Sequence, residues 1–368
     1  MKKVVLFSDL HLDSAFAWMS GAPEAARRRR QALRDTLLKI IETTVEAKAD
    51  ALLCGGDLYE HDRVTPDTAE FLKSAFERLG SIRVFIAPGN HDWYGPQSLY
   101  RTVEWSPNVQ VFDHSRLQPV ELEDGLTLWG AAHQTPANTP GFLDGFKVKT
   151  SGIHLALFHG SERGWFTEQG EGKAQHAPFD AEQIVAAGIH HAFLGHYHGP
   201  RDYDRLTYPG NPDPLSFGED GSRGAVVATI REDGSIEREH VSVAVTEVHD
   251  ITVDVTGCGS QQDVRDRAQE AIQALRGVVR LTMQGEMAPA IDLRRHDILS
   301  LPTERESLAV EMGGLYVGYD LEAIKNEATV RGEFVRQVTA VDLLEDERRR
   351  VLVTGLRALD GRDDLEVR

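Results

Sequence analysis

Five short clusters of Asp, His and Asn occur in the first 200 residues, and their side chains are ligands that divalent cations bind. The clusters are Asp9-Leu10-His11, Gly56-Asp57, Gly89-Asn90-His91-Asp92, His159-Gly160 and Gly195-His196-Tyr197-His198. Carboxylate and amide oxygens, together with imidazole nitrogens, suit two cations held side by side. Two such cations about 3.5–4 Å apart generate hydroxide and hold the non-bridging oxygens during an in-line displacement at phosphorus. The pattern therefore predicts a hydrolytic metal centre for phosphoesters.

The positions of the candidate ligands suggest how they divide between two cations. Asp9 and His11 are two residues apart at the end of an expected strand, so they can face one cation together. Asp57 stands alone after two glycines, which suits a carboxylate that bridges both cations. His198 can complete the first site, and the second site is expected to use the remaining candidates, which are Asn90, His159 and His196.

Two further residues of the third cluster are candidates for catalysis. His91 directly follows the candidate ligand Asn90, so we expect it to point at the substrate. An imidazole in that place can stabilise the transition state or protonate the leaving oxygen. Asp92 is expected to orient His91 or another imidazole through a hydrogen bond.

The strands that hold these clusters can be predicted from short apolar runs. Residues 4–7, 52–54 and 84–87 form such runs, and each ends just before one of the first three clusters. Helical periodicity over residues 23–48 and 66–79 separates them. Further strands are expected at residues 109–112, 126–130, 154–158, 192–194 and 226–230, with a hairpin turn at 232–234. This alternation is typical of α/β domains, in which ligands collect at the carboxyl ends of the strands.

The character of the chain changes near residue 246. An alternating strand at 248–255, a helix at 262–275 and a strand at 278–283 follow, without a metal motif. One or two helices are expected within residues 339–359. We therefore expect a domain with the metal clusters at 1–245, a small α+β domain at 246–335 and a C-terminal helical segment at 336–368.

Composition limits the cellular setting and the partners. The two cysteines, Cys54 and Cys258, fit a reducing compartment better than a disulfide scaffold. The first apolar run is too short for a signal peptide because Asp9 follows at once. No uncharged run reaches the roughly 18 apolar residues that a membrane helix needs. We therefore expect a cytoplasmic protein without membrane contact.

The net charge of −18 is mild evidence against nucleic-acid binding by this chain alone, because phosphate recognition favours a basic face. Net charge is a sum over the whole molecule, however, and bound cations reverse the charge locally. The charge therefore does not exclude a nucleic-acid substrate.

In their order along the chain, the motifs Asp-x-His, Gly-Gly-Asp, Gly-Asn-His-Asp, a lone His and Gly-His-x-His resemble calcineurin-like metallophosphoesterases. The resemblance covers roughly residues 1–240. It implies a four-layer α/β/β/α sandwich with two divalent metal ions. By this resemblance, one ion takes Asp9, His11, Asp57 and His198, and the other takes Asp57, Asn90, His159 and His196.

Within that family, three details are similar to the SbcD-like branch of DNA-repair nucleases. They are Gly55-Gly56-Asp57-Leu58-Tyr59, the loop Tyr208-Pro209-Gly210-Asn211-Pro212 with Phe217-Gly218-Glu219 after it, and a small α+β module that resembles a DNA-capping domain. The branch implies a Mn²⁺-dependent DNA exonuclease or endonuclease, often a homodimer, that works with an SbcC-like coiled-coil ATPase. The ligand set would also accept Fe or Zn.

Two positions depart from the branch pattern. Asn211 stands where a serine is usual, and Glu60 stands where some members carry a histidine, with His61 one residue later. The second departure leaves the polarity of an exonuclease and the balance of exonuclease and endonuclease activity open. Two alternatives to a DNA nuclease also stay open. One is a phosphodiesterase or phosphatase for a small phosphoester such as a cyclic nucleotide, and the other is a non-catalytic subunit.

Several single residues allow two interpretations. His159 is favoured over His154 as the ligand because it ends an apolar run and precedes Gly160. Trp93 and Tyr94 could stack on a base, beside His61 as a further substrate contact, or could pack beneath their loop. The same ambiguity applies to Trp165-Phe166. The run Arg27–Arg30 is interpreted as an exposed helix face rather than a phosphate site. We expect the remaining histidines near strand ends to lie at the surface or around the site; they are His133, His190 and His191. Structural positions are expected for His114, His176, His240, His249 and His296.

Overall fold

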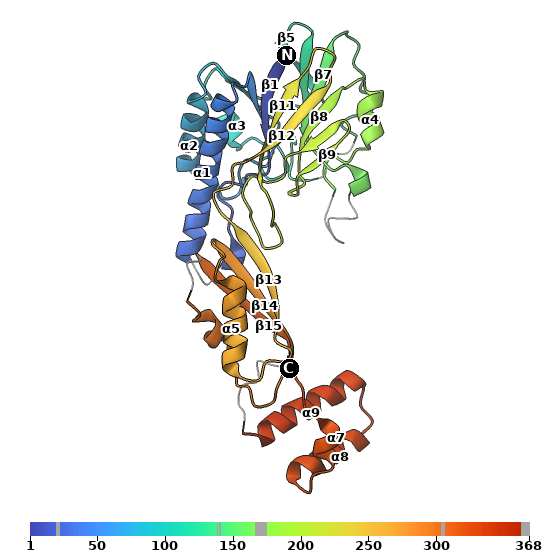
Figure 1. Cartoon of the computed structure of the whole chain (residues 1–368). Coiled ribbons are helices and arrows are strands. Elements are labelled where there is room, and N and C mark those ends of the chain that lie inside the picture. Colours follow the sequence, from blue (N-terminus) through green and yellow to red (C-terminus); the bar gives the residue numbers. More distant parts are fainter. Residues whose placement is uncertain (20–22, 138, 140, 166–174, 303–305, 362–368) are drawn as a thin grey trace. The chain divides into compact units, whose positions relative to one another are not determined.

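The computed structural model of the chain describes residues 1–19, 23–137, 139, 141–165, 175–302 and 306–361 (Figure 1). It contains two compact units, Met1–Thr246 and Glu247–Arg368, which we call the first unit and the second unit. Each unit has hydrophobic clusters of its own. No helix in the described ranges is long and apolar enough to cross a membrane.

Two six-stranded sheets form the centre of the first unit. The first sheet has the order β12-β11-β1-β2-β3-β4, in which β1 to β4 run parallel and β11 pairs antiparallel with β1. Its strands are β1 (Lys2–Phe7), β2 (Ala51–Cys54), β3 (Arg83–Ile86), β4 (Val109–Val111), β11 (Gly224–Ile230) and β12 (Ile236–Ser242). The second sheet has the order β5-β6-β7-β8-β10-β9. Its strands are β5 (Gln118–Glu123), β6 (Leu126–Gly130), β7 (Ile153–His159), β8 (His191–Gly195), β9 (Arg201–Tyr203) and β10 (Leu206–Tyr208).

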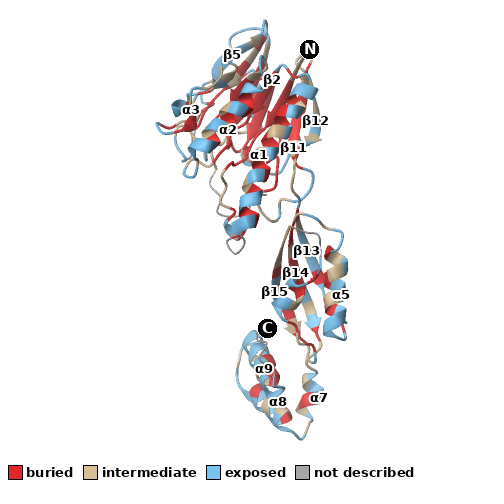
Figure 2. Ribbon diagram, turned by 90° about the vertical axis from the view of Figure 1, so that its left-hand side faces the viewer, coloured by how far each residue is buried: buried red, intermediate tan, exposed pale blue. Residues whose placement is uncertain are grey.

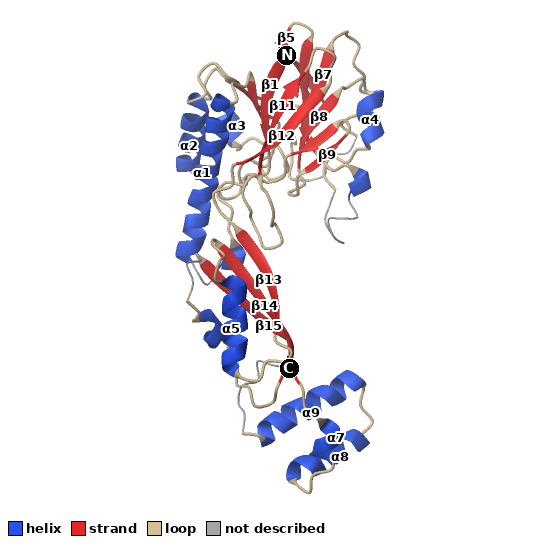
Figure 3. Cartoon of the chain, in the orientation of Figure 1, coloured by secondary structure: helices blue, strands red, loops and turns tan. Residues whose placement is uncertain are grey.

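Helices cover the outer faces of the two sheets (Figure 3). The helices α1 (Pro23–Glu46), α2 (Pro66–Glu77) and α3 (Leu99–Thr102) lie beside the first sheet, and α4 (Ala181–Ala186) lies beside the second. A short 3₁₀ helix, η1 (Ala17–Met19), precedes α1. The predicted four-layer α/β/β/α sandwich is therefore confirmed.

Successive residues of β7 belong to two different apolar clusters, one on each face of the second sheet. Figure 2 shows the buried strands of the first sheet behind α1 and α2, whose outer sides are exposed. Leu155 and Leu157 of β7 belong to a cluster shared with apolar residues of the first sheet, such as Leu6 and Leu53. Their neighbour Phe158 belongs to another cluster that includes residues of α4. Because both faces of β7 are buried, the strand reads as a continuous apolar run.

Parallel pairing brings the carboxyl ends of the central strands to one edge. Phe7 of β1 is paired with Cys54 of β2, and Cys54 with Ile86 of β3. In the second sheet, the last residue of β7 is paired with the last residue of β8. The five clusters of candidate ligands lie at or just after the carboxyl ends of these five strands.

The second unit contains a three-stranded parallel sheet with two crossover helices. The strands β13 (Val248–Asp254), β14 (Val278–Met287) and β15 (Ser307–Val317) pair in the order β13-β14-β15. The connections contain α5 (Gln261–Ile272) and α6 (Arg295–Leu299). The helices α7 (Leu321–Lys325), α8 (Val330–Ala340) and α9 (Glu345–Leu359) follow and share a small apolar cluster. This helical part begins before residue 336, where the sequence had suggested its start.

A buried ion pair connects α1 to the loop after β10. Arg29 is fully buried in α1, and its guanidinium lies 3.1 Å from the carboxylate of Asp213. The same carboxylate accepts hydrogen bonds from the Thr36 hydroxyl at 3.0 Å and from the backbone N–H of Val245 at 2.8 Å. This position corrects the expectation that Arg27–Arg30 form an exposed face, because the side chain of Arg29 points inward.

Replacing Arg29 with Met should destabilise the first unit strongly. The substitution keeps the volume but leaves the buried Asp213 carboxylate without its cation, and such a loss costs about 3–5 kcal/mol. Urea unfolding followed by circular dichroism measures the free energy. Arg27→Met, at an exposed position of the same helix, is the matched control and should change the stability by about 0.5 kcal/mol at most. Equal stability of the two variants would contradict the prediction.

Candidate metal centre

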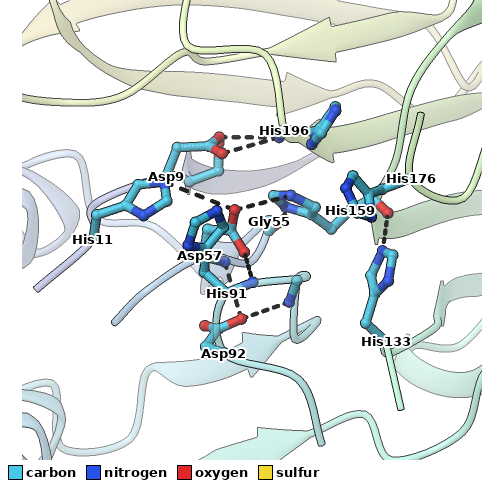
Figure 4. A network of polar contacts seen from close by, with 12 residues as sticks. Asp9, His11, Gly55, Asp57, His91, Asp92, His133, His159, His176 and His196 are labelled. Carbon is cyan, nitrogen blue, oxygen red and sulfur yellow. Dashed lines mark hydrogen bonds and ion pairs between the residues drawn. The ribbon is translucent and has the colours of Figure 1, made fainter. Parts of the chain in front are cut away.

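The candidate ligands come together where the strand ends of both sheets meet (Figure 4). Three groups each bring one ligand atom per residue within 4.8 Å of one another. The groups are Asp9, His11 and His198; Asp9, Asp57 and His159; and His11, Asp57 and His91. Asp9, His11 and Asp57 occur in two groups each, so they lie at the middle of the arrangement.

Several ligand atoms at this place are buried and have no hydrogen-bond partner. They are Nε2 of His11, Oδ1 of Asn90, Nε2 of His159 and Nε2 of His196. Buried side-chain polar atoms almost always have a partner in folded proteins, and each exception calls for an explanation. Imidazole nitrogens and an amide oxygen beside two carboxylates are an appropriate donor set for divalent cations. These residues therefore fit a pair of bound metal ions.

The backbone at the ligands is held in a conformation that non-glycine residues seldom adopt. The φ angles are 55° at Asp9, 51° at His11, 51° at Asp57 and 114° at His196. A positive φ is unfavourable for residues with a Cβ atom and persists only where the surroundings enforce it. The surroundings here include hydrogen bonds between the loops, from Asp9 N to Gly56 O and from His11 N to Asp57 O, both at 2.9 Å. Backbone strain is therefore concentrated at the centre.

Glycine is required beside the bridging candidate. Gly56 has a φ of +98°, and a Cβ atom there would lie 2.7 Å from the carbonyl oxygen of Ala87 and 2.8 Å from Nδ1 of His159. A larger residue would thus displace a candidate ligand as well as strain the backbone.

His159 is fixed between a carbonyl group and the Asp57 carboxylate. Its Nδ1 lies 2.9 Å from Gly55 O, and its Nε2 lies 3.2 Å from Asp57 Oδ2. Burial disfavours its charged form, but the Asp57 carboxylate raises the pKa of His159 to about 9. Burial likewise opposes ionisation of Asp57, yet His159 and its neighbours hold the pKa of this carboxyl well below its ordinary value. A cation needs the neutral imidazole, so binding here would release a proton.

The alternative histidine of the same strand is engaged elsewhere. His154 contacts Thr150 O through Nε2 at 3.0 Å and the Trp129 indole through Nδ1 at 3.3 Å. It belongs to none of the three ligand groups, whereas His159 does. The geometry therefore favours His159 as the candidate ligand.

Asp92 organises the loops of the centre through their backbone. Its carboxylate accepts hydrogen bonds from Gly89 N at 2.6 Å, Leu58 N at 2.7 Å and Asp57 N at 3.1 Å, and from the Tyr100 hydroxyl at 2.5 Å. Burial and the nearby charge of Asp57 raise the pKa of Asp92 to about 6. These contacts correct the expectation that Asp92 orients an imidazole, because its oxygens are used by backbone donors and a phenol.

His91 lies at the open side of the centre. Its side chain is 45% exposed, and its ring centroid lies 4.8 Å from that of His11. Its backbone N–H donates to Asp57 Oδ1 at 2.8 Å, and its Nδ1 lies 3.0 Å from Glu60 Oε2. The contact with Glu60 is the main cause that raises the pKa of His91 to about 9. The ring of His91 can therefore contact a substrate and can carry a proton.

The two candidate ligands after β8, His196 and His198, are held by contacts with distant segments of the chain. The backbone N–H of His196 donates to both carboxylate oxygens of Asp9 at 3.1 Å. Nδ1 of His198 lies 2.7 Å from Glu219 Oε1. Glu219 also accepts from Asn211 Nδ2 at 2.6 Å, so the loop after β10 supports His198.

Two histidines that the sequence placed outside the centre lie beside it. His176 was interpreted as structural, but its ring lies 5.5 Å from that of His196, and it lines the cavity described below. His133 contacts the carbonyl group of His159 through Nε2 at 2.9 Å. Burial lowers the pKa of His133 to about 4, which keeps this imidazole neutral at ordinary pH.

A cavity of about 770 Å³ opens at the centre. The candidate residues His11, Asp57, Asn90, His91, His196 and His198 line it. Other lining residues that the motifs did not identify as substrate contacts are Ser14, His176, Tyr197, Arg201, Phe217 and Arg223. Arg223 approaches His198 O and Asn211 Oδ1. Arg223 could hardly be recognised as a site residue from the sequence, because it is a single arginine in a polar stretch.

The expected aromatic contacts to substrate do not line this cavity. Tyr94 packs against the cluster between the sheets, and the Arg101 guanidinium lies 5.6 Å from its ring. Trp93 and His61 lie against each other, with ring centroids 4.1 Å apart. Trp93, Tyr94 and His61 are not among the residues that line this cavity, so their contact with a substrate stays a prediction. Trp165 packs against Tyr197 and Tyr208, and Phe166 lies outside the described residues.

Comparison with known proteins identifies the fold family and distant relatives. Residues 2–214 match the sequence profile of the family described as calcineurin-like phosphoesterase. The chain is 27% identical over 302 residues to an uncharacterized metallophosphoesterase, YhaO, of Bacillus subtilis (strain 168), which covers 76% of this chain and 70% of that protein. It is 23% identical over 394 residues to the DNA double-strand break repair protein Mre11 of Methanopyrus kandleri, which covers 98% of this chain and 79% of that protein. A crystal structure of a Thermus thermophilus protein covers 65% of this chain and 98% of its own at 12% identity, with a TM-score of 0.36, and that likeness is too weak to carry an argument.

Mn²⁺ should raise the thermal unfolding midpoint of the protein, and Asp57→Asn should abolish most of the rise. A ligand that binds only the folded state stabilises it by about 2.7 kcal/mol at 100 times its Kd. Asn offers the candidate bridging position one neutral oxygen in place of a charged carboxylate. Calorimetry with EDTA and with Mn²⁺ gives the shift for each variant, and comparing shifts removes any effect of the substitution on the metal-free protein. The exposed Asp62→Asn control should keep the full shift. An equal shift in Asp57→Asn would contradict the assignment.

Proposed function

Because the chain belongs to the calcineurin-like phosphoesterase family, we propose that it is a metal-dependent phosphodiesterase that hydrolyses DNA. The observation that carries the hydrolytic part is the set of buried ligand atoms without a hydrogen-bond partner that both sheets place beside one cavity. The family uses divalent metal ions, and the candidate groups of this chain fit such ions.

The ligands divide between two positions in this proposal. Asp9, His11 and His198 would hold one ion, Asn90, His159 and His196 would hold the other, and Asp57 would bridge them. When bound, two divalent ions polarise phosphoryl oxygens and lower the pKa of water. Mn²⁺ is our proposal for the metal, because the motifs resemble the Mn²⁺-dependent nuclease branch and because carboxylate and amide oxygens suit this ion.

His91 has the position required to assist at the phosphate. Its ring lines the cavity and is partly exposed, and Glu60 holds its Nδ1. A protonated imidazole there can stabilise charge on the phosphoryl oxygens or give its proton to the leaving oxygen. Arg201 and Arg223 also line the cavity and supply positive charge for a phosphate backbone in a chain whose net charge is −18.

Three observations support DNA as the substrate. The relative described as a DNA double-strand break repair protein aligns with 98% of this chain and therefore with the second unit as well. The motifs Gly55–Tyr59 and Tyr208–Pro212 resemble the SbcD-like nuclease branch. In addition, the second unit has a separate core, as a substrate-capping domain requires. On the same grounds we propose a homodimer and an SbcC-like coiled-coil ATPase as partner.

A second candidate function is hydrolysis of a small phosphoester such as a cyclic nucleotide. The net charge of −18 favours it, because a polyanion is repelled more strongly than a small ester. The same centre would perform the chemistry in either case, so the two functions differ only in the substrate.

An assay of purified protein with Mn²⁺ separates the two functions. End-labelled single-stranded and double-stranded DNA are incubated beside a chromogenic small diester. We expect labelled DNA to be shortened or cut, with EDTA abolishing the reaction because the ions are removed. Turnover of the small diester with no cut in any DNA would refute the nuclease and favour the second function.

His91→Ala should reduce kcat by about 10²–10⁴-fold, the range expected for loss of one general acid or base. Mn²⁺ affinity, measured by isothermal titration, should stay within about twofold of the wild type, because His91 is not among the proposed ligands. His114→Ala is the matched control, since the side chain of His114 is 66% exposed, and it should keep full activity. A kcat of His91→Ala near that of the wild type would remove His91 from the mechanism.

A further inference from the structure

We propose that Glu60 is a positioning residue that connects the first candidate cation position to His91. The inference rests on the proposed function and concerns one of the two positions at which the chain departs from the branch that it resembles. A single carboxylate holds a candidate metal ligand with one oxygen and the candidate acid with the other.

The contacts of Glu60 divide evenly between two imidazoles. Its Oε1 lies 2.7 Å from Nδ1 of His11, and its Oε2 lies 3.0 Å from Nδ1 of His91. The two rings are nearly perpendicular, at 80°, with their centroids 4.8 Å apart. The carboxylate therefore ties together two rings that lie side by side at the edge of the cavity.

The backbone keeps the Glu60 side chain in this place. Glu60 N donates to Leu12 O at 3.0 Å, just after His11. The next residue donates from its N–H to His91 O, also at 3.0 Å. A β-bridge between Leu12 and Tyr59 extends the pairing of β1 and β2 past the candidate ligands. Glu60 is thus anchored both to the segment of His11 and to that of His91.

This geometry selects the ring nitrogen that His11 presents to a cation. A carboxylate only accepts hydrogen bonds, so the Nδ1 atoms of His11 and His91 must carry the protons. Nε2 of His11 is then the nitrogen with a free lone pair. That atom is buried without a hydrogen-bond partner and lies 3.7 Å from Asp57 Oδ2. A carboxylate behind a metal-binding imidazole fixes its tautomer and its orientation in this way.

A histidine at position 60, as some members of the resembling branch carry, could not do the same. A neutral imidazole has one acceptor nitrogen, so it could accept from only one of the two rings. Glutamate supplies two acceptor oxygens and a negative charge beside both histidines. The substitution therefore changes how the candidate acid is held while leaving the ligands unchanged.

His198, the other imidazole proposed for the same cation as His11, can be compared with His11. His198 has a carboxylate behind its Nδ1 as well, from Glu219 at 2.7 Å. Glu219 makes its further contacts with Asn211 Nδ2 and Leu215 N rather than with His91. Both glutamates should support the cation, but only Glu60 should act through His91.

The variants Glu60→Gln and Glu219→Gln, each alone and combined with His91→Ala, test this difference. Gln keeps the size but offers one acceptor oxygen and an NH₂ donor. Both variants should weaken Mn²⁺ binding by about 10–100-fold, the range for partners behind metal ligands. At saturating Mn²⁺, Glu60→Gln should lower kcat in the wild type but not further in His91→Ala. The kcat effect of Glu219→Gln should be the same in both backgrounds. Asp62→Asn, which removes a nearby exposed charge, should change neither quantity.

Nitrogen-15 NMR of the histidine rings in the metal-free protein gives a readout without turnover. In the wild type, His11 and His91 should both show a protonated Nδ1, and Glu60→Gln should alter both rings whereas Glu219→Gln alters neither. Circular dichroism in EDTA checks that each variant is folded. Unchanged ring signals and unchanged Mn²⁺ affinity in Glu60→Gln would overturn the proposal, as would a kcat loss equal in both backgrounds. If the wild type hydrolyses no substrate, the proposed function fails, while the NMR and Mn²⁺ measurements still decide the role of Glu60.

Discussion

The buried carboxylate of Asp57 is the interaction on which the rest of the centre depends. Its side chain is only 4% exposed. It lies 3.2 Å from His159 Nε2 and accepts a hydrogen bond from the His91 N–H at 2.8 Å. It also shares a ligand group with Asp9, a second buried carboxylate. Two buried negative groups at this separation are unfavourable without positive charge. The surrounding imidazoles supply some of that charge, and divalent cations would supply the rest.

Apolar packing between the sheets and hydrogen bonds between the loops hold this unfavourable cluster of charges in place. The apolar cluster between the two sheets fixes their strand ends, and the hydrogen bonds from Asp9 and His11 continue the pairing of β1 and β2 into the loops. These contacts hold positive φ angles at several ligands. Such strain is typical of functional sites, where rigidity in the surroundings keeps reactive groups in place. The contacts that stabilise the sandwich therefore also fix the geometry of the site.

Carboxylates behind the ligands form a second level of organisation. Asp92 binds the backbone of the loops, whereas Glu60 and Glu219 each hold an imidazole by its Nδ1. These three acids come from three separate segments of the chain. Their negative charge helps to explain how a protein of net charge −18 can concentrate cations at one point. The buried pair of Arg29 and Asp213 anchors the loop that carries Glu219 to α1.

The sequence alone determined the ligand types, the order of the motifs and the main strands and helices of the first unit. These features are local, because a buried strand followed by Gly and Asp can be recognised within ten residues. It missed the strands β9 and β10, which have three residues each and so give little periodicity, and it also missed β5 and β15. Only the tertiary structure decided that Asp92 binds backbone, that Tyr94 packs inward, that His176 reaches the cavity and that Glu60 joins two imidazoles. These features depend on contacts between distant segments, such as that of Glu60 with His11, 49 residues apart. Sheet register sets such contacts, and neither residue type nor spacing contains that information.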